Sequence, residues 1–218
     1  MVCSDAERSR CVFFFSIMGD LRFISHKDTL RMFHRMFARA DLPVRFSTGF
    51  NPHPRISVVL PRPVGVASEA EAVEIRFEQP VDLADVLRRL AERSPAGLRW
   101  LSGERLEMGE RLRAESVRYR LEPTDSGCQG LPDRVRELVA AKALPVERRS
   151  AKDGKCRVVD IRPYIVDCAF EDDAVGFTLR VTPGGSARPA EVAGLLGFEA
   201  RMVNHRIRRV EIQWERVR

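Results

Sequence analysis

Along the first hundred residues, apolar or alternating stretches are interleaved with amphipathic stretches, and this pattern predicts an order of strands and helices. Stretches of strand character lie at residues 11–18, 55–61, 70–78 and 98–106, with a short extended piece at 44–47. Two stretches with helical spacing lie between them, at residues 24–43 and 82–95. The predicted order is β-α-β-β-α-β, which is that of the ferredoxin-like split β-α-β unit.

The remaining residues repeat this rhythm less regularly. Strands are predicted at residues 116–123, 144–150, 158–172, 174–182 and 206–215, and helices at 131–143 and 188–198. The polar stretch at 108–115 is the expected boundary. The sequence therefore predicts an α+β fold with a ferredoxin-like domain at residues 1–110 and a second α+β unit with extra strands at 111–218.

The helix predicted at residues 24–43 has an apolar face and a defined start. Leu30, Phe33 and Phe37 recur at helical spacing and form a stripe that should face the core. Ser25 stands at the expected N-cap, and Asp28 follows three residues later in a pattern like a capping box.

Between this helix and the next strand, residues 46–65 (FSTGFNPHPRISVVLPRPVG) are dense in proline and glycine. Gly49 allows a backbone conformation that other residues resist, and the X-Pro pairs hold the chain extended. A rigid, extended backbone that presents Asn51, His53 and Arg55 suits recognition of a phosphate group or a base edge. A structural turn that enters the next strand is the alternative interpretation.

The formal net charge is +6, and basic residues are concentrated at the two ends of the chain. Residues 1–55 carry nine Lys or Arg against five Asp or Glu, and residues 201–218 carry six Arg against two Glu. Two groups of arginines stand out: a ridge on the first helix, beside Lys27, and a group near the C-terminal strand, where Arg206 and Arg208 should share a face. They are Arg31, Arg35 and Arg39, and Arg206, Arg208 and Arg209. These surfaces are either solvated or bind the phosphates of RNA.

The sequence gives weaker support for a catalytic site or a metal site. His26 and His53 could act as acid and base only if they converge within about 3 Å of a common substrate atom. A Ser25–His26–Asp28 triad is disfavoured, because neighbouring helix residues point in different directions. The histidines lack the spacing of a metal site, so no metal is expected. The glycines in TPGGSARP (182–189) are more typical of a hairpin turn than of a phosphate loop.

The five cysteines are scattered and odd in number, with no CxxC pair; they are Cys3, Cys11, Cys128, Cys156 and Cys168. This distribution disfavours a disulfide framework, a zinc site and a sequence-local iron–sulfur site, and favours reduced, partly buried thiols. No apolar run reaches the roughly 18 residues of a membrane span, and the polar start lacks the pattern of a signal peptide. A cytoplasmic protein without a membrane partner is expected.

Residues 12–80, from GDLRFISHKDTLR through RADLP and GFNPHPRIS to PRPVGVASEAE, closely resemble the radical SAM-linked (radical SAM-associated) family, a domain of unknown function. The later segments VVDIRPYI (158–165) and RPAEVAGLLG (188–197) also resemble it. In that family the domain often follows a cobalamin-binding radical SAM module or is encoded beside one. The resemblance implies a partner enzyme that carries an iron–sulfur cluster, SAM and cobalamin. This chain lacks the CxxxCxxC motif, so no cofactor is expected in it.

The family pattern falls on a set of mostly polar positions with no established catalytic role: Arg22, Ser25, His26, Asp28, Arg31, Gly49, Asn51, Pro52, His53, Pro54, Arg55, Ser57, Gly65, Ser68 and Glu71. Two positions depart from the pattern. Lys27 stands where leucine is usual, and Asp41 replaces the glycine of RAGLP, so the helix loses an easy left-handed residue at its end.

Together these observations favour a non-catalytic accessory domain that works with a radical SAM enzyme and binds RNA or presents substrate. The expected contact residues are Arg22, Ser25, His26, Asp28, Arg31, Arg35, Asn51, His53 and Arg55. One alternative is an enzyme that acts on RNA or a nucleotide, with His26 and His53 as acid and base. Another is a module that only docks a protein partner.

Overall fold

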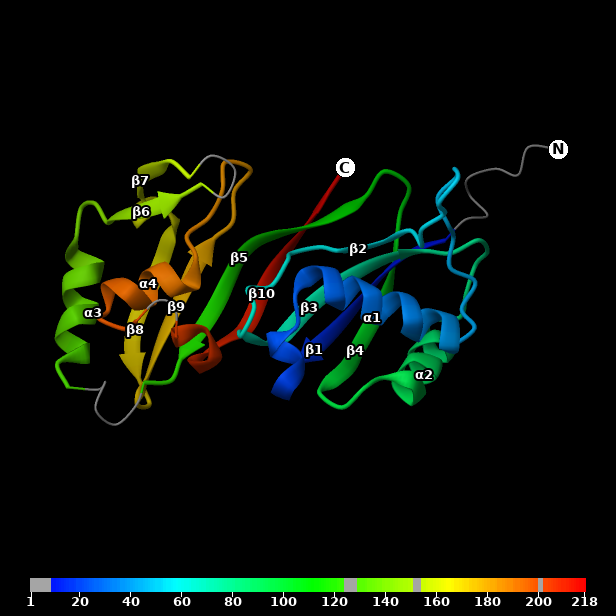
Figure 1. Cartoon of the computed structure of the whole chain (residues 1–218), viewed down its shortest axis with the longest axis horizontal. Coiled ribbons are helices and arrows are strands. Elements are labelled where there is room, and N and C mark those ends of the chain that lie inside the picture. Colours follow the sequence, from blue (N-terminus) through cyan, green and yellow to red (C-terminus); the bar gives the residue numbers. More distant parts are fainter. Residues whose placement is uncertain (1–8, 124–128, 151–153, 200–201) are drawn as a thin grey trace. The chain divides into compact units, whose positions relative to one another are not determined.

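The computed structural model describes residues 9–123, 129–150, 154–199 and 202–218. The chain divides into two compact units, one formed by residues 1–114 and 214–218 and the other by residues 115–213 (Figure 1). Both units combine helices with antiparallel strands, so the predicted α+β class is confirmed. Within the described ranges, no helix is both long enough and apolar enough to cross a membrane.

The first unit follows the predicted order of elements. These are β1 (Arg10–Ile17), η2 (Gly19–Phe23), α1 (His26–Arg39), β2 (Ile56–Val58), β3 (Ala67–Arg76), α2 (Leu83–Arg93) and β4 (Leu98–Leu106). The strands are ordered β4-β1-β3, and β2 also pairs with β3; every one of these pairs is antiparallel. This arrangement is compatible with the expected ferredoxin-like unit.

The core of the first unit lies between the sheet and its two helices. Cys11, Phe13, Phe15 and Ile17 alternate along β1, and each is at most 1% exposed. They share one apolar cluster with the buried residues of α1 and α2, which both cover this face of the sheet (Figure 1). The alternation sends every second side chain to the core, as the period of a strand requires.

The predicted stripe on α1 forms part of this core. Phe33 and Phe37 are at most 2% exposed, and Leu30 packs against the same cluster. The Phe33 ring meets the Phe15 ring edge to face at a centroid distance of 5.2 Å. The core contact fixes the rotation of α1 and turns the arginine ridge away from the sheet.

The second unit is built on β5 (Arg111–Leu121), α3 (Leu131–Ala140), β6 (Pro145–Arg149), β7 (Cys156–Asp160), η4 (Arg162–Tyr164), β8 (Ile165–Glu171), β9 (Ala174–Arg180), α4 (Pro189–Leu195), η5 (Val203–Arg206) and β10 (Ile207–Val217). The strand order is β10-β5-β9-β8, and β6 and β7 form a separate hairpin. Thr182 and Gly185 exchange two backbone hydrogen bonds of 3.0 Å, so the glycine-rich segment forms a tight turn, as predicted.

One of the predicted strands is corrected by the structure. Residues 158–172 do not form one strand, because η4 separates β7 from β8. Pro163 lies in this short helix and has no N–H to contribute to a ladder. The short extended piece expected at residues 44–47 forms isolated bridges, Val44 with Phe77 and Phe46 with Pro54.

Candidate functional site

The start of α1 is fixed by the predicted cap. Ser25 Oγ accepts a hydrogen bond of 3.1 Å from the Asp28 N–H and donates one of 2.7 Å to the Asp28 carboxylate. The other carboxylate oxygen accepts from Arg31 at 3.0 Å. The Ser25 hydroxyl, and after it the Arg31 guanidinium, hold the pKa of Asp28 below its usual value. Ser25 and Asp28 are therefore occupied in capping the helix.

One flank of α1 borders a groove of about 580 Å³. Its rim carries arginines from two helices, and its floor is apolar. The rim residues are Arg31, Arg35, Arg39 and Arg93, and the floor residues are Leu21, Ile24, Met32 and Met36. We call this feature the α1 groove. Arg93, at the end of α2, was not foreseen from the sequence, because only the packing of α2 beside α1 brings it to the ridge.

The α1 groove keeps an excess of positive charge. Arg31 has an acidic partner in Asp28, and both side chains are more than half exposed. In the part of the chain that the structure describes, Arg35, Arg39 and Arg93 form no ion pair. An exposed pair contributes little and is readily exchanged for another partner. The rim is therefore available to an anionic ligand.

The segment Phe46–Arg55, which we call the exposed loop, follows α1 in the chain. Its base is closed by two hydrogen bonds, from the Ser47 N–H to the His53 carbonyl (2.8 Å) and from the His53 N–H to Ser47 Oγ (3.0 Å). Burial, followed by the charge of His53, lowers the pKa of His34. The charge of the loop residue His53 thus acts on α1 at His34, which is turned about 100° from Arg35 around the helix.

The predicted contact residues of the exposed loop are open to solvent. Asn51, His53 and Arg55 are exposed, and within the described residues their side chains make no hydrogen bond or ion pair. Gly49 has a φ of +136°, which favours glycine. Phe50 next to it is fully exposed (106%). Phe50 was missed from the sequence, although an aromatic residue outside any periodic pattern and beside Gly49 was a visible signal.

His26 and His53 have different surroundings. His26 is exposed at the first turn of α1 and borders a small enclosed cavity with Arg62 and the buried Glu71. His53 instead interacts with His34, which is eight residues, or about 12 Å along the axis, beyond His26. The structure therefore associates His53 with His34 and His26 with the buried carboxylate.

Arg22 belongs to a junction within the first unit. Its carbonyl accepts hydrogen bonds of 2.7 Å from the Gly65 N–H and from the Arg62 guanidinium. Its own guanidinium lies 4.9 Å from the centre of the Phe23 ring. These contacts tie η2 to the segment before β3 and position the residues that lead into α1.

The C-terminal arginines behave differently from the ridge on α1. Arg209 is only 2% exposed, and its guanidinium lies 5.8 Å from the centre of the Tyr119 ring. Arg208 forms an ion pair with Glu122 at 3.0 Å. Arg206 lies in η5, before β10 begins, so the expectation that it shares a strand face with Arg208 is wrong. This group is largely committed to contacts within the second unit.

Three cysteines fall in described residues, and all three are free thiols: Cys11 and Cys168 are buried, and Cys156 is exposed. Burial raises the pKa of Cys168 to about 12, which keeps its thiol protonated and unreactive. Cys3 and Cys128 lie outside the described residues.

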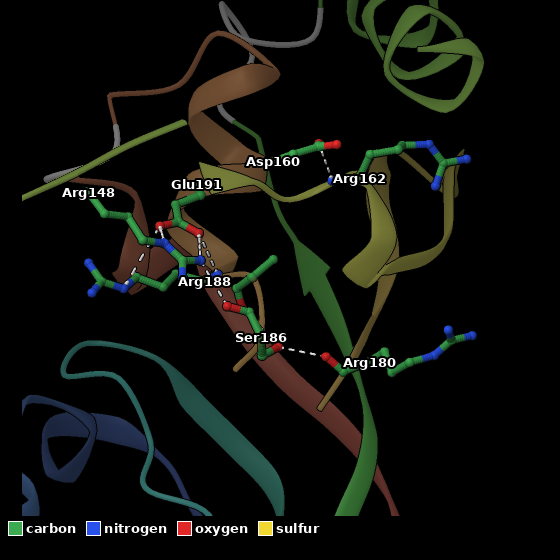
Figure 2. Close-up of polar contacts among 8 residues, drawn as sticks. Arg148, Asp160, Arg162, Arg180, Ser186, Arg188 and Glu191 are labelled. Carbon is green, nitrogen blue, oxygen red and sulfur yellow. Dashed lines mark hydrogen bonds and ion pairs between the residues drawn. The ribbon is translucent and has the colours of Figure 1, made fainter. Parts of the chain in front are cut away.

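The two family-like segments of the second unit carry buried or capped charges. Arg148 and Glu191 form a bidentate pair with distances of 2.8 and 2.7 Å, and their side chains are 12% and 13% exposed (Figure 2). Arg148 also donates to the Ser186 carbonyl at 2.8 Å. Glu191 accepts from the Arg188 N–H at 2.8 Å, so it joins the start of α4 to β6. These contacts are structural.

The segment VVDIRPYI also has a structural use. Asp160 accepts a hydrogen bond of 3.0 Å from the backbone N–H of Arg162 (Figure 2). It accepts another of 2.8 Å from the Leu144 N–H, and these two bonds lower its pKa. The Arg162 guanidinium donates to the carbonyls of Ala141 (3.1 Å) and Val139 (3.3 Å) at the end of α3. It therefore satisfies carbonyls that a helix end leaves without intrahelical partners.

The fold and site define an α+β protein in which one unit bears an arginine-rimmed groove and an exposed loop. Residues 10–189 match the family described as "Uncharacterized protein conserved in bacteria (DUF2344)", and the chain belongs to that family. No curated protein matches the chain. The family description names no activity and no partner, so the link to radical SAM enzymes stays a prediction.

Proposed function

We propose that this chain is a non-catalytic accessory protein that works with a radical SAM enzyme and binds RNA through the α1 groove and the exposed loop. The observation that carries the proposal is the arginine rim above an apolar floor, in which Arg35, Arg39 and Arg93 form no ion pair within the described residues. Lys and Arg side chains that neutralise phosphates dominate the affinity of nucleic-acid complexes. An apolar floor beside such charges suits the base and sugar of an unpaired nucleotide.

The size and lining of the α1 groove fit this role. Its volume of about 580 Å³ lies within the range of pockets that hold small molecules. Met32 and Met36 line the floor, and methionine side chains adapt to flat ligands of different shape. The groove would therefore tolerate different bases while the arginines hold the backbone.

The exposed loop supplies the contacts that can discriminate between RNA bases. Asn51 can donate to and accept from a base edge, and Arg55 can hold a phosphate or a guanine edge. Phe50 offers a ring on which a base can stack, at about 1–3 kcal/mol per base. Single-stranded RNA is read by this combination of stacking and edge contacts.

A non-catalytic role agrees with the placement of the candidate acid and base. The charge of His53 acts on His34, which is two turns along α1 from His26, and His26 borders the cavity with Glu71. The partner enzyme would supply the radical chemistry, and this chain would hold the substrate. The support for that partner is the resemblance of residues 12–80 to the radical SAM-linked family.

The test is a titration of tRNA and rRNA fragments with the full chain across a salt series. Arg31→Ala, Arg35→Ala and Arg55→Ala should each weaken binding and lower the slope of log K against log salt by about 0.7. Arg188→Ala is the matched control, because this exposed arginine lies in the second unit. No binding, or equal effects of all four changes, would overturn the proposal.

The partner is tested separately by co-purification with a radical SAM protein from the same genome. The proposal predicts a complex that RNA strengthens. A complex that survives high salt and contains no RNA would instead identify a module that only docks protein.

A further inference from the structure

Three arginines meet at the base of the exposed loop, on backbone segments that are bonded to one another. The Arg45 N–H donates to the Arg76 carbonyl at 2.8 Å, and the Arg76 N–H donates to the Arg55 carbonyl at 3.0 Å. The Arg55 N–H closes the triangle by donating to the Arg45 carbonyl at 2.7 Å. Arg45 thus precedes the exposed loop, Arg55 ends it, and both are bonded to Arg76 at the end of β3.

The alternation along the strand places these side chains away from the helices. Ile75 and Phe77, on either side of Arg76, are 0% exposed and belong to the core under α1 and α2. Val44, beside Arg45, is 6% exposed in the same core. Since successive side chains of an extended chain point to opposite faces, Arg45 and Arg76 belong to the face of the sheet opposite the α1 groove.

One acidic residue close to this cluster is already engaged. Glu74 lies two positions before Arg76 on β3 and pairs with Arg10 at 3.0 Å. Its other oxygen accepts from the Leu112 N–H at 3.1 Å. In the described part of the chain, Arg45, Arg55 and Arg76 have no ion pair.

The arginines of this cluster act on one another electrostatically. Burial, and then the charges of Arg10, Arg55 and Arg45, lower the pKa of the Arg76 guanidinium, against a smaller opposing effect of Glu74. Neighbouring like charges disfavour the charged form of each, and an anion between them would remove that repulsion. Planar guanidinium groups bind the oxygens of phosphate in bidentate geometry.

We propose that Arg45, Arg55 and Arg76 form a phosphate-binding site at the base of the exposed loop, distinct from the α1 groove. The ligand group is a phosphate, either a terminal phosphate or a phosphodiester of an RNA strand. For an RNA ligand, the inference rests on the proposed function. Binding of inorganic phosphate does not depend on it, because the three arginines would also hold that ion. Since Arg45 and Arg55 lie at the two ends of the loop, bound phosphate would also fix the loop at its base.

The first experiment uses inorganic phosphate and pyrophosphate as probes and the full chain in a low-salt, phosphate-free buffer. Backbone amide and arginine Nε–H resonances are followed by NMR. We expect saturable shifts at residues 45, 55 and 76, and Arg76→Gln should weaken pyrophosphate binding by about tenfold or more. Arg76→Gln should fold normally, because it removes a repelled charge.

The matched control is Arg99→Gln, which makes the same change of charge at an exposed arginine of β4 in the same unit. The pyrophosphate affinity of this variant should stay within about twofold of the wild-type value, as expected for a distant, screened charge. The site is refuted if the amides of residues 45, 55 and 76 do not respond, or if Arg99→Gln and Arg76→Gln weaken binding equally.

The second experiment compares RNA oligonucleotides with a 5′-phosphate and a 5′-hydroxyl. A preference for the 5′-phosphate that Arg76→Gln abolishes assigns the site to a terminal phosphate. An equal loss of affinity for both oligonucleotides in Arg76→Gln assigns it to a phosphodiester. Pyrophosphate binding without RNA binding would keep this site and refute the proposed function. RNA binding that Arg76→Gln leaves unchanged, with no pyrophosphate binding, would refute this site and keep the proposed function.

Discussion

The exposed loop of the first unit and the family-like segments of the second unit look alike as sequence, since each places charged residues beside proline. The structure uses them in opposite ways. Arg148, Glu191 and Arg162 have several partners each, and the first two are only 12–13% exposed in their side chains. Asn51 and Arg55 are exposed, and their side chains make no hydrogen bond or ion pair within the described residues.

The difference shows that a polar signature does not by itself mark a ligand site. A charged group in a half-buried place must be paired, and its partners then explain its presence. A charged group that stays exposed and unpaired on a rigid, proline-held backbone has no such internal explanation. The second unit thus serves as an internal reference for the first, and the changes below should separate effects on stability from effects on binding.

The largest effect on stability is expected for Glu191→Gln. The change leaves the Arg148 guanidinium half-enclosed without its counter-charge and should lower the free energy of unfolding by about 3 kcal/mol. Urea denaturation would measure this as a lower midpoint at an unchanged slope. Arg188→Gln is the control, because this side chain is 67% exposed and should change stability by less than about 0.5 kcal/mol. Equal effects would contradict the structural role of the pair.

Arg162→Gln should have the next largest effect. It removes charged donors from the carbonyls of Ala141 and Val139 at the end of α3, and we expect a loss of about 2 kcal/mol. In the variant, hydrogen exchange should be accelerated relative to the wild type in the last turn of α3, and less so in β9. An unchanged exchange rate there would show that Arg162 does not hold the helix end.

Phe50→Ser should change binding and leave stability alone. The ring is fully exposed, so the free energy of unfolding should stay within about 0.5 kcal/mol of the wild-type value. Affinity for single-stranded RNA should fall by about 1–2 kcal/mol if a base stacks on the ring. Phe50→Tyr is the control and should retain the affinity. A loss of stability, or equal binding by Phe50→Ser, would remove the loop from the proposed interface.

The effect of Asp160→Asn should depend on pH. Because the pKa of the Asp160 carboxyl is lower in the folded state, its charged form contributes stability above the unfolded pKa, about 3.9. That contribution is lost as the pH falls through the folded pKa. The free energy of unfolding of the wild type should exceed that of Asp160→Asn at pH 6, and the difference should decrease toward pH 3. A difference that is constant with pH would show that the charge of Asp160 does not contribute to stability.

The smallest effect is expected for Asp41→Gly. Asp41 has a φ of +48° just after α1, a conformation that glycine adopts without strain. The hydrogen bond from Arg89 to the Asp41 carbonyl remains, and the ion pair that is lost, at 3.6 Å, involves a fully exposed carboxylate. We therefore expect a net gain of about 0.5 kcal/mol. Asp41→Ala keeps the strain and should give no gain. Thermal unfolding of the three proteins would decide between these outcomes.

Local sequence patterns predicted much of the fold. The apolar run of strand character at residues 11–18, the stripe on α1 and the Ser25 cap all follow from neighbours within a few residues, and all are present. The strand expected at residues 158–172 failed for a local reason, the turn at Asp160–Pro163. The pattern of apolar residues continues through that turn, so hydrophobicity alone did not reveal it.

The candidate site was predictable only where its residues are close in sequence. Arg31, Arg35 and Arg39 follow from helical spacing alone. Arg93 joins them only because α2 packs beside α1, and Arg76 meets Arg45 and Arg55 only through strand pairing. Arg209 was expected to be accessible and is buried, because its position in β10 turns it toward Tyr119. Such long-range contacts leave little trace in local periodicity.

The central claim is that the exposed arginines on the rim of the α1 groove bind RNA. Its most direct test is the salt dependence of RNA binding by the wild type and by a triple variant with Arg31→Gln, Arg35→Gln and Arg39→Gln. We predict binding by the wild type and a slope of log K against log salt that is smaller by about 2 in the triple variant. An unchanged slope, or no RNA binding by the folded wild type, would contradict the account.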